Sequence, residues 1–459
     1  MRNTWSASAH EPLTSMAVEP LLTRDYDSRP ALVYENLRNK FGPVAPVDLL
    51  GMPVWLALGY PEVLEVLRNQ GGIWSKRLDH WRARAEGRVP PDWPLLPAFE
   101  VNHVIFQEGQ RLNDLRNAWS KALRPYQDGT QPQAWQLKAA VTRYADDLIT
   151  LLSEGSGRTG WADLSAQYTR PLSLMVVNHL LGFESAQGDG VLMDMWRVLD
   201  AGPDSAAALE RLLSALSDLA TAKMARPGDD FPSYMLAAYP ELTVDELSRE
   251  LMMLVGVTGD HTGTLICNTA AEVITGNAGA RNSLSLGMIR ETVNQVAMTN
   301  PPMANLSFRF PKIDVKLGNF TIAAGDPVML STAAAHADPL FAGNMAPDPI
   351  LSSRAHLAWG AGPHHCLARD LATTITTVAV SRLFERFAQL ELTLPADQLP
   401  WRSSPLMRGL RSLPVRFELS HGPIPGQEPA PGPVAGAPAL EERSSSPLWR
   451  FLTGLRRDR

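Results

Sequence analysis

Apolar positions recur with a helical period along most of this chain. Hydrophobic residues three or four positions apart dominate from about residue 100 to residue 275 and predict a succession of helices. Strand patterns are short: Val54, Leu56 and Leu58 alternate as in a strand, and further strand signals lie within residues 303–335. The pattern therefore predicts a mainly α fold with a small β region.

One long helix is marked at its start by a capping box. Thr243 is followed three residues later by Glu246, so each side chain can satisfy a backbone N–H of the other residue. Leu251, Leu254 and Val255 then give the helix an apolar face, and its centre is rich in glycine. Glycines there favour a local bulge in the helix.

A second helix, with Leu371, Ile375 and Leu383 at helical spacing, follows a cysteine almost at once. That cysteine, Cys366, ends the run Trp359-Gly360-Ala361-Gly362-Pro363-His364-His365-Cys366. A thiolate at a glycine-rich turn before a helix faces the helix N-terminus, where backbone N–H groups and the dipole lower its pKa. A heme iron suits such a thiolate, because the thiolate donates electron density to the metal.

Other interpretations of this run were compared with that one. Gly360 and Gly362 match two glycines of a dinucleotide-binding turn, but His365 stands where the third belongs. Zinc is excluded because the chain has only Cys267 and Cys366. A Cys/His protease pair and a buried structural cysteine stay open on the cysteine alone.

Composition narrows the class of protein. The chain has 459 residues, of which 45% are hydrophobic, enough for one large core or two domains. The net charge of −6 argues against a nucleic-acid partner. No apolar run approaches the length of a membrane span, and the N-terminus lacks the apolar core of a signal peptide. Two distant cysteines favour a reducing cytoplasm.

Segments of different composition predict the domain organisation. Residues 1–20 are expected to form a flexible N-terminal arm, and residues 21–420 the main domain. Residues 421–447 are rich in Pro, Gly, Ala and Ser and are expected to be a linker. Residues 448–459 form a short basic tail that is apolar on one side; it either stays solvated or contacts a partner protein or an anionic membrane surface.

The run ending at Cys366 resembles the heme-binding loop of the cytochrome P450 superfamily, whose pattern is Phe-Gly-x-Gly-x-His-x-Cys-x-Gly. Trp359 replaces the Phe and Ala368 the last Gly, whereas Gly360, His364 and Cys366 match. The resemblance covers roughly residues 20–420 and is to soluble actinobacterial members. It implies a single-domain fold with heme b between a distal and a proximal helix, Cys366 as the iron ligand, and Trp359 and Gly360 in the cofactor loop.

The resemblance also implies cations for the two heme propionates. Arg116 matches the Arg of the family's His-x-x-x-Arg helix, but Leu112 stands where the His belongs. Arg309 matches the family's strand Arg, and His364 is the third such group. An Arg fork suits a carboxylate, although either Arg would otherwise be read as a solvated surface charge.

The centre of the long helix resembles the family's oxygen-activating segment, Ala-Gly-x-Asp/Glu-Thr. Asp260 matches the acid, His261 replaces the catalytic Thr, and Thr262 comes one place later. The resemblance gives Asp260 a role in proton relay, with His261 or Thr262 holding water. The competing interpretations are a helix-surface acid for Asp260 and a packed histidine for His261.

The sharpest departure from the family is the Glu-x-x-Arg motif and its partner Arg. Aligned on Pro301-Pro302, these positions are Gln295, Met298 and Pro349. Loss of a whole buried ion-pair set can be neutral for stability, whereas loss of one member is costly. We expect a neutral patch at Gln295 and Met298, with no ion pair in the motif's place.

The resemblance implies an oxidoreductase that inserts one oxygen atom of O2 into a small apolar organic substrate, with electrons from a ferredoxin-type donor. Two alternatives stay open. One is a peroxide-dependent oxygenase or peroxidase in which His261 acts on bound peroxide. The other is a non-catalytic heme-binding partner in a signalling complex.

Overall fold

We obtained a computed structural model that describes residues 12–153, 158–183, 185–200, 203–276, 288–342 and 355–420. The chain divides into two compact units. The first comprises Met1–Asn113, Asn294–Cys366 and Trp401–Arg408. The second comprises Asp114–Val293, Leu367–Pro400 and Gly409–Arg459.

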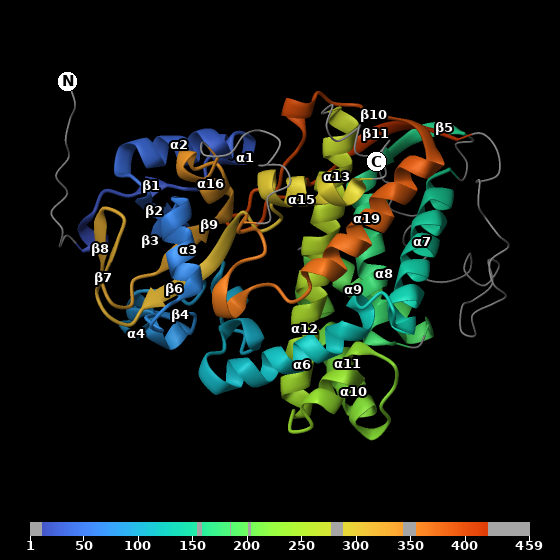
Figure 1. The fold of residues 1–459 in the computed structure, drawn as a ribbon, viewed down its shortest axis with the longest axis horizontal. Coiled ribbons are helices and arrows are strands. Elements are labelled where there is room, and N and C mark those ends of the chain that lie inside the picture. The colour runs from blue at the N-terminus through green and yellow to red at the C-terminus, as the bar shows by residue number, and fades with distance from the viewer. Residues whose placement is uncertain are drawn as a thin grey trace. The chain divides into compact units, whose positions relative to one another are not determined.

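A six-stranded sheet is the centre of the first unit among the described residues, and it is labelled in Figure 1. Neighbouring strands pair parallel between β1 and β2 and between β3 and β9, and antiparallel elsewhere. In spatial order the strands are β1 (Glu19–Pro20), β2 (Val44–Leu49), β3 (Met52–Ala57), β9 (Val328–Ser331), β6 (Asn305–Pro311) and β4 (Trp74–Ser75). The strand signals expected within residues 303–335 are confirmed, and they include the antiparallel pair β7 (Val315–Leu317) and β8 (Phe320–Ile322).

Both faces of this sheet are covered. Val54 and Leu56 of β3 belong to one buried cluster, whereas Trp55 and Ala57 belong to a second. The alternation predicted for this strand is therefore real, but it separates two cores rather than a core from solvent. Short helices and turns of the first unit supply the covering residues: η1 (Leu13–Ser15), α1 (Arg24–Ser28), α2 (Pro30–Phe41), α3 (Tyr60–Arg68), η2 (Leu78–His80), α4 (Arg82–Ala85), α5 (Leu96–Phe99), η3 (Val104–Phe106) and α16 (Thr332–His336). Two further short elements, α17 (Pro339–Ala342) and η6 (Gly362–His364), contact α16 and α3 respectively.

Residues 71–100 are rich in Trp, Pro and Gly, a composition that predicts a long loop, yet they contain β4 and three short helical segments. Trp81 and Trp93 pack edge-on at 5.6 Å between ring centres, and Phe308 of β6 lies against both rings. Burial of these large rings stabilises short helices that local propensity alone would not form.

The second unit is mostly helical. Its helices are α7 (Pro132–Ser153), α8 (Arg170–Leu181), α9 (Ser185–Asp200), α10 (Ser205–Ala225), α11 (Phe231–Ala238), α12 (Val244–Gly256), α13 (Gly263–Thr275) and α19 (Arg369–Arg386). Two further helices, α6 (Gly109–Gln127) and α15 (Ile289–Thr299), contain a boundary between the units. A three-stranded antiparallel sheet closes the unit, in the order β10 (Phe387–Leu392), β11 (Pro414–Leu419) and β5 (Thr159–Asp163).

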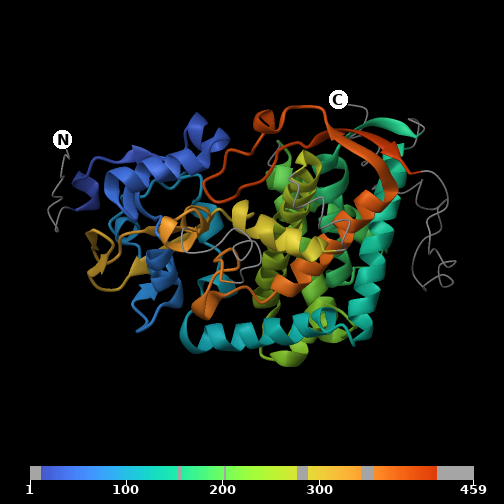
Figure 2. The ribbon, with the colours of Figure 1, turned by 45° about the horizontal axis from the view of Figure 1, so that its top comes forward.

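The predicted capping box is confirmed at the start of α12. Thr243 accepts a hydrogen bond from the backbone N–H of Glu246 at 3.2 Å, and Glu246 accepts one from the backbone N–H of Thr243 at 2.9 Å. From there α12, the π-helical turn η5 (Val257–Thr262) and α13 follow one another as one long helix. Figures 1 and 2 show this helix with α19 alongside α13.

Some expectations concern parts of the chain that the structure covers only in part. Residues 12–20 of the predicted arm are described; Leu13 is buried and β1 pairs with β2. The predicted linker and tail, residues 421–459, lie outside the described residues.

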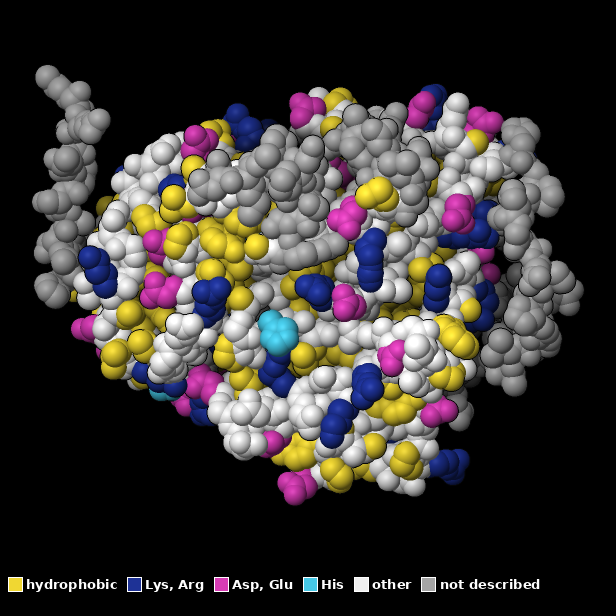
Figure 3. All heavy atoms as spheres, in the orientation of Figure 1, with side chains coloured by type: hydrophobic (Ala, Val, Ile, Leu, Met, Phe, Trp, Pro, Cys, Tyr) yellow, Lys and Arg dark blue, Asp and Glu magenta, His cyan; other side chains and the backbone are white. Residues whose placement is uncertain are grey.

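The described surface shown in Figure 3 has no strong charge of one sign, and the described helices show no membrane span. No helix among the described residues has the length and apolarity to cross a bilayer. On the face shown in Figure 3, acidic and basic side chains are interspersed with apolar ones.

Candidate functional site

The loop that carries Cys366 is closed by its own backbone. The Cys366 N–H donates to the carbonyl oxygen of Trp359 at 2.8 Å, and the Gly360 N–H donates to that of Leu357 at 2.9 Å. Cys366 is half-buried, forms no disulfide, and lies three residues before the start of α19. The loop therefore presents a thiol beside a helix N-terminus, as the sequence predicts.

Two glycines shape this loop through positive φ angles. Gly360 has φ of 69° and Gly362 has φ of 65°, a region that favours glycine. Gly362 also packs against the end of α3: a Cβ atom added there would lie 2.2 Å from the carbonyl oxygen of Leu67. The close approach of two backbones fixes the loop on α3.

Arg309 lies in β6 of the same unit and is 5% exposed. Its Nη1 donates to the carbonyl oxygens of Ser307 and Phe308 at 2.9 and 3.1 Å, and it forms no ion pair among the described residues. Burial lowers its pKa to about 10, with Glu108 acting in the opposite direction. A buried guanidinium with only backbone partners is suited to an anionic ligand.

The second unit contains the distal residues of the predicted site. Asp260, His261 and Thr262 lie on the π-helical turn η5, which interrupts the long helix. Such turns occur often at functional sites because they displace backbone groups from the regular hydrogen-bond pattern. Here Ser173 of α8 donates from its hydroxyl to the carbonyl oxygen of Gly259 at 2.6 Å.

The three distal residues differ in exposure. Thr262 is buried, whereas Asp260 and His261 are half-buried. Burial lowers the pKa of His261 below its ordinary 6.5, although the neighbouring Asp260 opposes the shift. His261 is therefore neutral at pH 7 and able to accept a proton.

Arg116 and Leu112 lie one helical turn apart on α6. Leu112 is buried and Arg116 is half-buried. The same helix is held to α12 by Trp119, whose indole N–H donates to the buried carboxylate of Glu250 at 2.7 Å.

The helix that should bear the Glu-x-x-Arg motif is α15. Met298 is buried, as predicted, but Gln295 is only half-buried. Pro349 lies outside the described residues, so the loss of the motif stays a prediction.

Two histidines that the sequence analysis did not single out lie beside α15. His356 bonds through Nε2 to Asn294 Oδ1 at 3.1 Å, and His336 bonds through Nδ1 to the Met298 carbonyl oxygen at 2.8 Å. The two rings are 5.8 Å apart and edge-on. No sequence motif connects residues so far apart, because only the packing of α16 brings His336 to α15.

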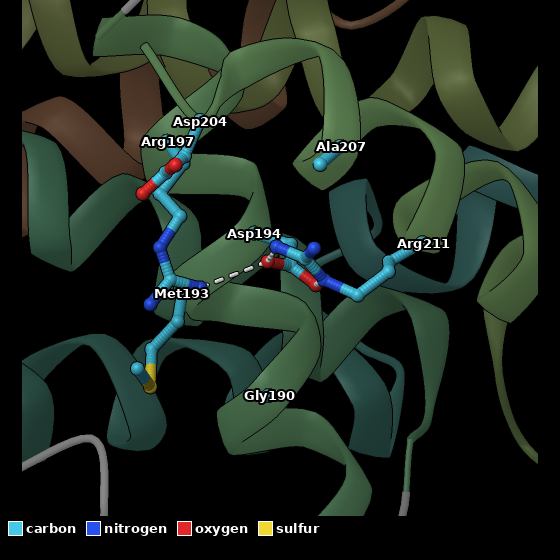
Figure 4. Close-up of a pocket in the computed structure, with 7 residues that line it drawn as sticks. All are labelled: Gly190, Met193, Asp194, Arg197, Asp204, Ala207 and Arg211. Atoms are coloured by element: carbon cyan, nitrogen blue, oxygen red, sulfur yellow. Dashed lines mark hydrogen bonds and ion pairs between the residues drawn. The ribbon is translucent and has the colours of Figure 1, made fainter. Parts of the chain in front are cut away.

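A hollow of about 520 Å³ lies elsewhere in the second unit, between α9 and α10. Figure 4 shows Asp194 between Arg197 and Arg211, which bind it at 2.9 and 2.6 Å. Burial disfavours the charge on Asp194, but the two arginines outweigh it and lower the pKa of this carboxyl. The polar lining is thus satisfied internally, and no predicted site residue contributes to it.

The predicted site residues thus fall into two sets, each described within its own unit. Cys366, His364, Trp359, Gly360 and Arg309 belong to the first unit, and Asp260, His261, Thr262 and Arg116 to the second. No group of three or more His, Cys, Asp or Glu side chains among the described residues is arranged to hold a metal ion. An iron held by one thiolate needs no such group.

Comparison with known proteins gives the family. No family model matches the chain. Cytochrome P450 107B1 of Saccharopolyspora erythraea is 32% identical over 395 residues, which cover 80% of this chain and 90% of that protein. The 2-hydroxy-5-methyl-1-naphthoate 7-hydroxylase of Streptomyces carzinostaticus is 26% identical over 397 residues, covering 82% and 92% of the two chains.

Solved structures agree. CYP154A1 from Streptomyces coelicolor A3(2) superposes with a TM-score of 0.70 at 27% identity and covers 87% of this chain and 98% of its own. CYP154C4 from Streptomyces sp. ATCC 11861 gives a TM-score of 0.77 at 24% identity, with coverage of 89% and 100%.

The fold and the thiolate loop define a heme-thiolate protein of mainly helical architecture with a small sheet region. The chain belongs to the cytochrome P450 family. It is accordingly an oxidoreductase that incorporates molecular oxygen, with heme b as its cofactor, an organic substrate and a redox partner. The residues present fit this cofactor, because Cys366 supplies a thiol at a helix start and Arg309 a buried cation for a carboxylate.

Proposed function

We propose that the chain hydroxylates a small apolar organic substrate in the cytoplasm, with electrons from a ferredoxin-type donor. One oxygen atom of O2 enters a C–H bond, and the other leaves as water with two electrons from the donor and two protons. The observation that carries the proposal is the π-helical turn that bears Asp260, His261 and Thr262 in the long helix of a P450 chain. The name of the naphthoate 7-hydroxylase supports this reaction class.

Each residue has a distinct role in this proposal. Cys366 holds the iron through its thiolate, and the N-terminus of α19 favours the negative charge on sulfur. When bound, the heme supplies the activation of O2. Arg309, Arg116 and His364 bind its propionates, and Trp359 and Gly360 shape the loop around the thiolate.

Proton delivery belongs to the distal turn. Asp260 exchanges protons with solvent, and the buried Thr262 hydroxyl and the neutral imidazole of His261 hold the water that carries them. The carbonyl oxygen of Gly259 is already bonded to Ser173, so the turn keeps its shape while the side chains act.

The electron donor approaches from the side of the thiolate loop. Gly362, Pro363 and His365 are exposed there, next to the half-buried Cys366. A small iron–sulfur protein can contact this loop without a membrane anchor, which fits a donor of the ferredoxin type.

The absorption spectrum of the reduced, CO-bound protein tests the thiolate assignment. The native protein is expected to show the red-shifted band of thiolate ligation, and Cys366→Ala is expected to abolish it. Cys267→Ala is the matched control, because Cys267 is buried within α13 and far along the chain from the loop. A Cys366→Ala protein that keeps the band would refute the assignment.

A second candidate, peroxide-dependent oxidation, is favoured by one observation. His261 occupies the position of the family's Thr and is held neutral by burial, so it can take a proton from peroxide. We expect peroxide-driven turnover to fall toward acid pH, where His261 becomes protonated; because burial lowers the pKa of His261, although Asp260 opposes the shift, this fall comes at a lower pH than for an ordinary histidine.

The matched variants are His261→Ala and His261→Asn. Both are expected to slow peroxide turnover and to remove its acidic limb, while heme content is unchanged; Asn keeps a hydrogen-bonding group that does not titrate. An unaltered rate and pH profile in both variants would make His261 a packing residue and leave proton delivery to Asp260 and Thr262.

A further inference from the structure

Two buried cations lie opposite one another at the edge of the first unit's sheet. β4 and β6 pair antiparallel, with Trp74 opposite Pro311 and Ser75 opposite Phe310. The next residues in this register are Lys76 and Arg309, which are 6% and 5% exposed. Like charges that face each other across two strands repel, and burial strengthens the repulsion.

Among the described residues, no carboxylate forms an ion pair with the Lys76 ammonium or the Arg309 guanidinium; Glu108 only opposes the fall in the pKa of Arg309 that burial causes. The Lys76 ammonium lies 5.5 Å from the centre of the Phe106 ring and makes no hydrogen bond or ion pair among the described residues. Burial and the neighbouring Arg309 lower its pKa well below the ordinary value. Since Arg309 bonds only to backbone carbonyls, two buried basic side chains lie together without an ion-pair partner among the described residues.

The nearest acid, Glu108, is already engaged. It accepts hydrogen bonds from the Ser75 hydroxyl and from the backbone N–H of Lys76 at 2.9 Å. Lys312 binds its other oxygen at 3.2 Å, and these partners together lower the pKa of Glu108 although burial opposes them. Glu108 thus binds the Lys76 backbone and a different lysine, which leaves the Lys76 ammonium unpaired.

The segment that carries Lys76 is connected to the thiolate loop. Gly362 of the loop packs on the end of α3, as described above. Asn69, directly after α3, donates to the Trp74 carbonyl oxygen at 2.7 Å and accepts from the Trp74 N–H at 2.9 Å. These bonds fix the turn that leads from α3 into β4 and Lys76.

We propose that Lys76 binds a carboxylate of the heme together with Arg309, in place of the histidine that the family pattern has at Leu112. In this chain the helix of the family's His-x-x-x-Arg pattern has one hydrogen-bond donor fewer for the heme carboxylates, because Leu112 stands in place of the histidine and is buried and apolar. A dianionic ligand brings the net charge of the two cations to zero and gives the ammonium the partners it lacks. This inference rests on heme binding and is independent of the reaction that the enzyme catalyses.

The test compares Lys76→Met, Lys76→Arg and Lys312→Met. Methionine at position 76 has a side chain of similar length to lysine but no charge, and arginine keeps the charge. Lys312→Met is the control, because it removes a nearby lysine at the surface. The readout is the rate at which the holoprotein loses heme to excess apomyoglobin. We expect at least a tenfold faster loss for Lys76→Met and little change for Lys76→Arg and Lys312→Met.

The cofactor supplies a second control. Protein reconstituted with heme dimethyl ester has no carboxylates, so the difference between wild type and Lys76→Met is expected to vanish. The heme-free Lys76→Met protein is expected to melt higher than wild type, because an uncompensated buried charge has been removed. Because this higher melting temperature is expected, we also expect the Lys76→Met protein to fold.

Two results would overturn the proposal. One is a rate of heme loss in Lys76→Met equal to that in Lys312→Met. The other is a difference that persists with the ester, which would mean that Lys76 acts through packing. The CO-bound spectrum of each variant reports thiolate ligation separately, so failure of this proposal is distinguishable from failure of the proposed function.

Discussion

At the scale of single residues, the thiolate loop depends on one glycine more than on its neighbour. Gly360 and Gly362 both have positive φ, but they differ in surroundings. A Cβ on Gly360 would meet nothing closer than 3.6 Å, whereas a Cβ on Gly362 would lie 2.2 Å from a backbone oxygen of α3. The first is therefore constrained by its own conformation alone, and the second also by packing.

This difference predicts unequal effects of alanine. Gly360→Ala is expected to cost about 1–2 kcal/mol, the conformational penalty of a non-glycine residue at positive φ. Gly362→Ala has the same penalty plus a backbone clash, so we expect a loss on the order of 3 kcal/mol or more and a marked fall in heme content. Melting temperature and heme per protein measure both; equal losses would contradict the packing argument.

At the scale of elements, His336 joins three segments of the first unit. From α16 its Nδ1 bonds to the Met298 carbonyl of α15, and its Nε2 accepts from the Leu357 N–H at 2.7 Å. Since the Leu357 N–H is a donor, Nε2 must be unprotonated and Nδ1 carries the hydrogen. The His336 ring therefore connects Leu357, which precedes the cysteine loop, to α15 only while the imidazole is neutral.

This geometry predicts a pH dependence of stability. Burial, followed by the nearby His356, lowers the pKa of His336 from 6.5 to about 3, although the bond to Met298 opposes the shift. The unfolded chain then binds a proton that the folded chain does not. The contribution is complete above pH 6.5 and is lost as pH falls toward 3, by up to about 1.4 kcal/mol per pH unit.

His336→Asn cannot titrate, so the comparison isolates this residue from the other histidines. We expect the variant to melt lower than wild type at pH 7 and to lose less stability than wild type between pH 6.5 and pH 4. Parallel curves of melting temperature against pH would show that His336 does not control the acid limb.

At the scale of the whole molecule, β11 is the last element among the described residues. This strand is the middle one of the three-stranded sheet and pairs with β10 on one side and β5 on the other. The strand β5 lies far from both of the other strands in the sequence. The linker composition that follows cannot build a core of its own.

We therefore expect removal of residues 422–459 to leave heme content and melting temperature nearly unchanged. A matched deletion of residues 412–459 also removes β11 and is expected to lower the melting temperature sharply, because β5 and β10 lose their partner. If the shorter truncation alone strips heme or lowers stability, the tail packs on the body and the predicted linker is wrong.

The sequence by itself determined the features that local chemistry encodes. The capping box at Thr243, the β7–β8 hairpin and the glycine-rich turn before Cys366 each depend on residues a few positions apart, so their pattern is sufficient to predict them. The candidate site has two sources: the glycine-rich turn before a helix singles out Cys366, whereas Asp260, His261 and Thr262 are predicted from their resemblance to the family's oxygen-activating segment.

Only the tertiary structure decided which distant residues share an environment. Lys76 lies in a stretch whose composition predicts a loop, and it is a buried cation because β4 pairs with β6 and brings it opposite Arg309. His336 became a hydrogen-bond partner of Met298 and Leu357 because tertiary packing places α16 beside α15 and the segment before the cysteine loop. Burial and like-charge proximity are properties of packing between segments that are distant in the sequence, and no local pattern records them.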